Sequence, residues 1–277
     1  MIGVLAIAFW LAPTFGYART ATLCVALNLA CAIAAWRLFR TATGPSAAAR
    51  SAQPPASAGS SISGAGSRGL LLRFAVTGLL GIGYEVLVVR VLAQVAEDTV
   101  YTFALLLAVY LVGPAAGAAM YARRVHAARA RSHDDEPVRD RLLAALAMAC
   151  LIGTGCLWGA EALKTFVLQQ LGTHMATALL AEAVLALVAF GPATMVMGAL
   201  FSHLSAMASM QGLSFGRALG VNTLGAMTAP LLFGVLLFPA LGPKAALLLV
   251  VAGYLLLIDV RQWRRAQVMV PAAALAV

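Results

Sequence analysis

Glu85 and Glu182 are two carboxylates that lie within long apolar stretches. A carboxylate on a membrane-spanning helix is costly and usually faces the bundle interior or an aqueous cavity. Counted at about 1.5 Å per residue from the expected helix ends, Glu85 lies about 8 Å and Glu182 about 10 Å below the outer membrane surface. Two carboxylates at matching depth could receive a dicationic amine or share a proton.

Arg90 offers a structural alternative for the same acids. It is five positions from Glu85, which is not the spacing of three or four that brings side chains together on one helix. Arg90 is therefore expected to reach another helix or the outer interface. A salt bridge between Arg90 and Glu182 would join two helices without forming a cation site, and this structural interpretation is favoured.

Further polar and helix-breaking residues occur in the two apolar segments around residues 174–206 and 214–238. Asn222 and Thr223 are candidate solute-binding residues, but hydrogen bonds between packed helices are the favoured interpretation. Pro192 and Pro230 predict kinks that free backbone carbonyls. His203 fits a hydrogen-bonded histidine better than a proton relay. Two glycine pairs predict helix contacts: Gly113 with Gly117, and Gly216 with Gly220.

No pattern in the sequence indicates catalysis. It contains no nucleophile–base pair, no metal-ligand spacing and no glycine-rich loop between a strand and a helix. The four cysteines, Cys24, Cys31, Cys150 and Cys156, lie in apolar segments and fit small buried side chains. We expect no catalytic residue, no metal and no cofactor in this chain.

The composition determines which elements must position these residues. The chain has 277 residues, of which 62% are hydrophobic and 10% charged, against roughly 45–50% and 25% in soluble domains. Such an apolar surplus excludes a water-soluble globule. Abundant Ala, Gly and Leu favour packed helices over a barrel of alternating strands. The prediction is an all-α, polytopic transmembrane helix bundle.

Runs without formal charge predict the helices, most of them near the roughly 20 residues that a crossing needs. They cover residues 1–12, 18–39, 69–95, 99–122, 141–163, 174–206, 214–238 and 244–263. The first is too short to cross alone and lacks the features of a secretory signal, so about seven to eight helices form the bundle.

Residues 41–68 are rich in Ala, Ser, Gly and Pro and predict a flexible cytoplasmic linker. It separates residues 1–40 from a six-helix membrane domain at 69–265, which a C-terminal tail follows at 266–277.

The basic residues predict the orientation. With the linker in the cytoplasm, four of the 19 Lys and Arg residues lie outside and the other 15 inside, as the positive-inside rule demands. The net charge of +9 thus reflects topology and predicts no nucleic-acid partner. We expect a multi-pass protein of the inner (plasma) membrane with a cytoplasmic C-terminus.

An internal repeat connects the two ends of the chain. The sequence PTFG at 13–16 precedes an apolar stretch that ends at Trp36, and PALG at 239–242 precedes one that ends at Trp263. Residues 1–40 then correspond to the last two helices of a preceding repeat, whose other helices are expected to be missing. Six helices after the linker equal one half of a major-facilitator-type transporter.

Three stretches carry a resemblance to a known family. The first is YEVLVVR at 84–90, the second spans 100–117, and the third combines Pro192, Thr194, Met197, Gly198 and Phe201 with residues 216–217 and 222–226. They resemble the membrane region of fused, major-facilitator-like spermidine synthases over roughly residues 69–265. Val88, Ser202 and Leu219 depart from the family pattern.

In that family the membrane region precedes a soluble aminopropyltransferase domain, and the chain stops at Val277, about where such a domain would begin. The resemblance therefore implies a membrane domain that is non-catalytic by itself. It would bind or transport a small, polyamine-like cation in the lipid bilayer. The alternative is a structural anchor or assembly module for a soluble synthase. Polar groups that converge on a cavity favour the first function, and polar groups that pair in a dry interface favour the second.

Overall fold

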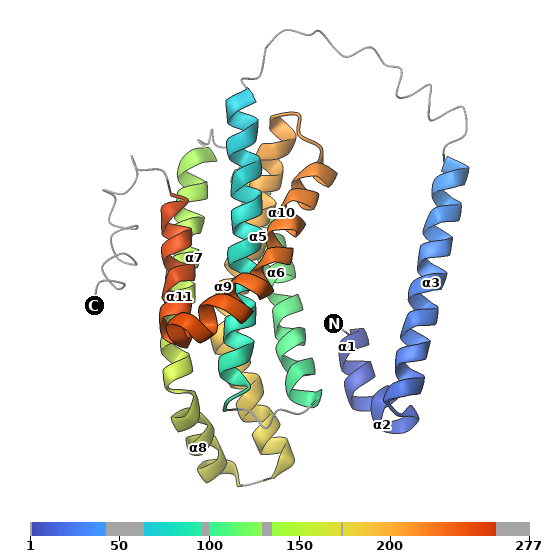
Figure 1. The fold of residues 1–277 in the computed structure, drawn as a ribbon, viewed down its shortest axis with the longest axis vertical. Coiled ribbons are helices and arrows are strands. Elements are labelled where there is room, and N and C mark those ends of the chain that lie inside the picture. The colour runs from blue at the N-terminus through green and yellow to red at the C-terminus, as the bar shows by residue number, and fades with distance from the viewer. Residues whose placement is uncertain (1, 43–63, 96–99, 129–134, 173, 259–277) are drawn as a thin grey trace. The chain divides into compact units, whose positions relative to one another are not determined.

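The computed structural model describes residues 2–42, 64–95, 100–128, 135–172 and 174–258. All regular secondary structure in these residues is helical (Figure 1), which confirms the predicted all-α bundle. The chain forms two compact units, Ile2–Ser63 and Gly64–Val277. Residues 43–63 of the predicted linker and the whole of the predicted tail at 266–277 lie outside the described residues, whereas residues 64–68 are helical.

The N-terminal unit is a helical hairpin. Its elements are α1 (Ile2–Ala6), the π-helical η1 (Ile7–Leu11), α2 (Ala12–Phe15) and α3 (Tyr17–Ala42). Gly16 separates α2 from α3 with a φ of 77°, a left-handed conformation that glycine adopts without steric cost. Within α3, residues 17–38 are long and apolar enough to cross a membrane.

The C-terminal unit contains all other helices that the structure describes. They are α5 (Gly64–Leu92), α6 (Val100–Ala128), α7 (Asp135–Trp158), α8 (Ala160–Leu171), α9 (Met175–Met210), α10 (Phe215–Ala229), the π-helical η2 (Pro230–Leu237) and α11 (Phe238–Leu256). The sequence did not predict α8, because the expected helix at 141–163 continues through Gly159, where the structure breaks it.

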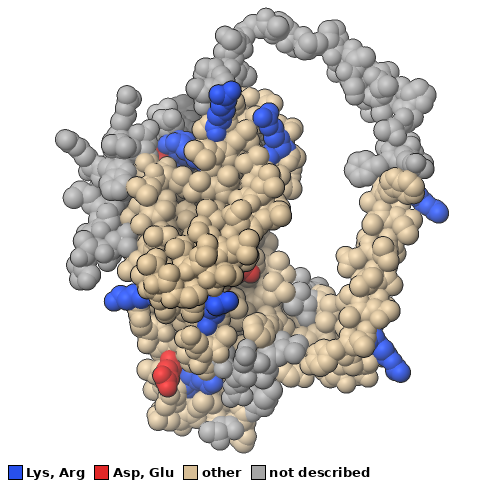
Figure 2. Space-filling view, viewed as in Figure 1, with Lys and Arg blue, Asp and Glu red and all other residues tan. Residues whose placement is uncertain are grey.

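Five apolar stretches of this unit are long enough to cross a membrane. The last covers 42 residues, 215–256, and the chain reverses within it at Gly242, whose φ is 79°. This stretch therefore contains two helical parts that run in opposite directions, in agreement with the two helices predicted at 214–238 and 244–263. Figure 2 shows, on one face of this unit, a broad band without Lys or Arg between two zones that carry them. The unit is thus a multi-pass membrane domain.

The predicted repeat has a structural counterpart in both units. Gly16 has φ 77° and ψ 162°, and Gly242 has φ 79° and ψ 167°. Each follows a π-helical segment and a proline, Pro13 or Pro239. The two segments therefore have the same local backbone conformation. Trp263, which completes the sequence repeat, lies outside the described residues.

Helices α6 and α9 run parallel and pack closely. A side chain at Gly113 would meet Thr194, one at Gly117 would meet the Met195 backbone, and one at Gly198 would meet Pro114. These small residues let the backbones approach each other, which confirms the contact predicted for Gly113 and Gly117.

A hydrogen bond also joins α6 and α9, nearer to the C-terminal ends of both helices. The hydroxyl of Tyr121 lies 2.9 Å from Nδ1 of buried His203. His203 is thus the hydrogen-bonded histidine that the sequence predicted.

Helices α5 and α10 form a second glycine-dependent crossing. A side chain at Gly225 would meet the Ala75 backbone, and one at Gly78 would meet Asn222. The contact predicted for Gly216 and Gly220 is not formed, because a side chain at either would meet no atom of the described residues within 4 Å. Both glycines belong to the α10 surface that is open in this unit.

Helix α7 packs against α9 and α11 through its buried residues Leu143, Leu146 and Cys150. At its start Arg139 and Asp140 form an ion pair of 2.8 Å, and both are almost fully buried. All four cysteines are free.

Candidate functional site

A cavity of about 370 Å³ lies between α5, α6, α7, α9, α10 and α11, which is within the range of roughly 300–1,000 Å³ for small-molecule sites. We call it the interhelical cavity. Its polar lining consists of Thr77, Tyr110, Ser202, Asn222, Thr223 and Tyr254. Its apolar lining includes Ile82, Leu146, Met197, Leu200, Phe201 and Leu219. Five of the six helices contribute a polar side chain, so polar groups converge on one space.

Glycines on α5 leave this space open. A Cβ atom at Gly81 would lie 3.7 Å from both the Tyr254 hydroxyl oxygen and the Met197 sulfur. At Gly78 it would lie 2.9 Å from the Asn222 side-chain oxygen. Because the two glycines are three positions apart, one helical turn of α5 borders both polar groups.

Asn222 and Tyr254 contribute polar groups that the protein does not satisfy. Tyr254 is completely buried, and its hydroxyl has no hydrogen-bond partner among the described residues. The half-buried Asn222 amide likewise makes no side-chain hydrogen bond within the described part of the chain. Buried polar groups are normally hydrogen-bonded, so both groups remain available to water or a solute.

The smaller hydroxyls of the cavity wall are partly used by their own helices. Thr77 donates to the Arg73 carbonyl at 2.8 Å, Ser202 to Gly198 at 2.9 Å, and Thr223 to Leu219 at 2.9 Å. A hydroxyl has one hydrogen to donate. These three residues therefore offer a solute acceptor oxygens, whereas Asn222 and Tyr254 offer donors as well.

Glu85 lies directly behind the cavity wall. Its carboxyl group lies close to the Tyr110 side chain, while Tyr110 itself lines the cavity. The Glu85 side chain is half-buried and does not line the cavity. The acid is thus separated from the cavity by one aromatic side chain.

Glu182 lies at a different level of the bundle. It is buried and accepts a hydrogen bond of 2.7 Å from Thr102, whereas Glu85 is beside Tyr110, eight positions further along α6. Eight helical residues correspond to about 12 Å.

The expectation of equal depth for the two acids was wrong because of the length of α9. This helix has 36 residues, or about 54 Å, and exceeds the roughly 30 Å of a bilayer core. Counting from its end therefore does not give the depth of Glu182 in the bilayer. The two carboxylates do not form the expected pair.

Arg90 is directed to neither acid. It is exposed, and its guanidinium carbon lies 5.3 Å from the centre of the Phe238 ring, within cation–π distance. It reaches another helix, as predicted. Among the described residues the one ion pair is that of Arg139 and Asp140, so the salt bridge between Arg90 and Glu182 is not formed.

The two predicted kink residues lie away from the cavity lining. Pro192 is inside α9, and Pro230 begins η2. A different proline, Pro114 of α6, lines the cavity. Of the predicted binding residues, Asn222 and Thr223 line the cavity, and Glu85, Glu182 and Arg90 do not.

Tyr110, Tyr254, Thr77 and Ser202 are cavity residues that the sequence interpretation missed. Each is an uncharged polar residue in an apolar helix, a weaker signal than a carboxylate. The sequence signal that could have located the cavity is the pair Gly78 and Gly81 on α5. Closely spaced small residues in an apolar helix predict a close approach of a neighbouring helix, and here that helix carries Asn222.

Searches against models of protein families, curated proteins and solved structures find no match to this chain. The resemblance to the membrane region of fused spermidine synthases, and the polyamine ligand that it implies, therefore remain predictions. The chain itself is a multi-pass, all-α membrane domain, and a largely apolar cavity with six polar side chains lies between its helices.

Proposed function

We propose that residues 64–258 bind a small solute in the interhelical cavity, as a membrane carrier or receptor domain would. The observation that carries this proposal is the pair of unsatisfied groups at the cavity, the Asn222 amide and the Tyr254 hydroxyl. Polar groups inside a membrane domain are costly and are commonly retained for function. A solute with hydrogen-bonding groups would satisfy both.

The competing function is a structural anchor for a soluble aminopropyltransferase. That function needs polar groups only as contacts between helices, in the way that Thr102 bonds to Glu182 and Tyr121 to His203. Asn222 and Tyr254 do not follow this pattern, because their side-chain polar groups line the cavity without a hydrogen-bond partner among the described residues. The convergence of polar side chains from five helices favours solute binding.

Thiol reactivity tests whether the cavity is open to water. Ala226 lines the cavity, and Ala218, on the same helix, is completely buried. Only an ionised thiolate reacts rapidly, so iodoacetamide should modify an Ala226→Cys variant and spare an Ala218→Cys variant. Trypsin would release both positions in the peptide 218–244, which contains no native cysteine. Equal protection of the two thiols would overturn the proposal.

A further inference from the structure

The wall of the interhelical cavity is uncharged. None of its lining residues in the described chain is Asp, Glu, Lys, Arg or His. Glu85 lies behind Tyr110, and Glu182 lies about 12 Å further along the bundle by the helical rise. A dication in this cavity would therefore lose its hydration without meeting a carboxylate, which is strongly unfavourable.

The two unsatisfied groups suit an uncharged polar partner. An Asn side chain offers two N–H donors and a carbonyl acceptor, and a Tyr hydroxyl offers one donor and an acceptor oxygen. A Cβ atom at Gly78 would meet the Asn222 backbone and its side-chain oxygen, and one at Gly81 would lie near the Tyr254 hydroxyl. The two glycines are three residues apart, so the anchors are offset along the α5 axis by about 4.5 Å. Because this offset is the smallest separation that the two groups can have, a solute that engages both needs two hydrogen-bonding groups joined by a spacer.

The remainder of the lining suits a carbon chain between those groups. Ile82, Met197 and Phe201 supply apolar surface. We infer that the cavity selects an uncharged solute with two amide-like or hydroxyl groups joined by a short apolar spacer, and discriminates against a dication of the same length. This inference rests on the proposed function, since it assigns a ligand class to the same cavity.

Three compounds with one carbon skeleton test this selectivity. Putrescine has two cationic amines, N-acetylputrescine has one, and N,N′-diacetylputrescine has none but presents two amides. Each would be titrated against iodoacetamide modification of full-length Ala226→Cys, read on the peptide 218–244 by mass spectrometry. We expect the half-protecting concentration to be lowest for the diacetyl compound and at least tenfold higher for putrescine.

Variants of the two anchors test their roles. In the Ala226→Cys background, Asn222→Ala and Tyr254→Phe should each raise the half-protecting concentration of N,N′-diacetylputrescine about five- to tenfold, the effect of losing one hydrogen bond. Thr228→Ala is the matched control on α10, because Thr228 bonds to the Gly225 carbonyl and does not line the cavity. Its effect should be less than twofold.

The outcomes separate this inference from the proposed function. If the Ala226→Cys thiol does not react, the cavity is closed to water and both fail. If it reacts and putrescine protects at an equal or lower concentration than the diacetyl compound, the uncharged-ligand inference is wrong and solute binding stands. Reaction without protection by any of the three compounds also overturns the ligand class.

Discussion

Two buried tyrosines of the C-terminal unit differ in what their hydroxyls contact. Tyr84 on α5 donates to the Ala189 carbonyl of α9 at 2.9 Å. Tyr254 on α11 is equally buried, but its hydroxyl has no partner among the described residues. An unpaired buried hydroxyl costs folding free energy, so the Tyr254 hydroxyl remains available to water or to the proposed solute.

This difference predicts opposite effects of two Tyr→Phe substitutions. Tyr254→Phe removes an unsatisfied hydroxyl and should raise the free energy of unfolding by about 1 kcal/mol in solute-free protein. Tyr84→Phe removes a hydrogen bond between helices and should lower it by about 1 kcal/mol. Denaturant unfolding of the purified protein in detergent measures both. A Tyr254→Phe variant that is destabilised as much as Tyr84→Phe would indicate that the Tyr254 hydroxyl is paired.

Residue types alone predicted part of the site. Asn222 and Thr223 were identified because uncharged polar pairs are conspicuous in an apolar helix, and both line the cavity. Glu85 and Glu182 are even more conspicuous in the sequence and were predicted to form a pair. The distance between them depends on how far α5 and α9 are shifted relative to each other along the bundle axis. A sequence does not contain that offset, because it arises from packing between helices.

At the scale of the helix, glycine positions control how closely α5 and α10 approach. A side chain at Gly225 would collide with the backbone of Ala75, while one at Gly220 on the same helix would meet open space. Gly113 and Gly117, which form a helix contact, are four residues apart, and so are Gly216 and Gly220, which form none with the described residues. The spacing alone therefore predicted a contact at Gly220 that does not form.

Substitution of these two glycines should therefore have opposite effects. Gly225→Ala should force α5 and α10 apart and lower the free energy of unfolding by about 1–3 kcal/mol. Gly220→Ala should be neutral or stabilising by up to about 1 kcal/mol, because alanine favours the helix. Thermal unfolding in detergent compares the two variants. Equal destabilisation would show that α10 packs through a different face.

The sequence predicted most helices but not their interruptions. Apolar runs locate α5, α6 and the combined segment of α10 and η2 to within six residues at each end, because the bilayer demands stretches of that length. The separate helix α8 depends on the backbone at Gly159, and the π-helical segments η1 and η2 depend on local hydrogen bonding before the repeated motifs at 13–16 and 239–242. Hydropathy does not report such backbone details.

For the whole molecule, the positions of basic residues predict an orientation across the membrane. Helices α5 and α6 are each one candidate span, so residues 43–63 and 129–134 should lie on one side and residues 96–99 on the other. The excess of Lys and Arg predicts that the first two segments are cytoplasmic.

Reporter fusions within these three segments measure the orientation. A phosphatase reporter should be active only at 96–99, and a fluorescent reporter only in the other two segments. The same signal from 96–99 and 129–134 would contradict a single crossing by α6. A complete inversion would retain the helices but refute the predicted direction.

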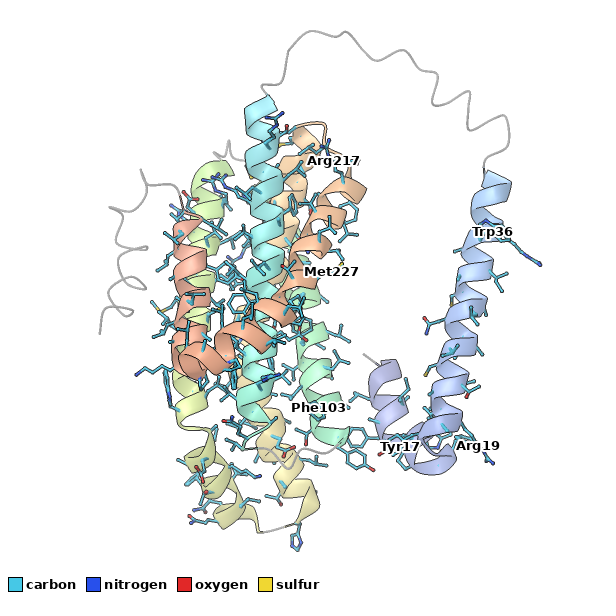
Figure 3. All side chains as sticks on the ribbon, in the orientation of Figure 1. Tyr17, Arg19, Trp36, Phe103, Arg217 and Met227 are labelled. Atoms are coloured by element: carbon cyan, nitrogen blue, oxygen red, sulfur yellow. The ribbon has the colours of Figure 1, made fainter. Side chains whose placement is uncertain are left out.

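Solute binding requires that the interhelical cavity contain water or solute, not lipid. Neighbouring residues of α10 separate these possibilities, because Ala226 lines the cavity while Met227 is exposed on the outer surface of the helix (Figure 3). A nitroxide label would be placed at Ala226→Cys or Met227→Cys in protein whose four native cysteines are replaced by alanine, reconstituted in lipid bilayers. Collisions with a water-soluble nickel chelate and with oxygen, which concentrates in lipid, would be measured by electron paramagnetic resonance. We predict that nickel dominates at position 226 and oxygen at position 227; dominance of oxygen at both would mean that lipid fills the cavity, and would contradict solute binding.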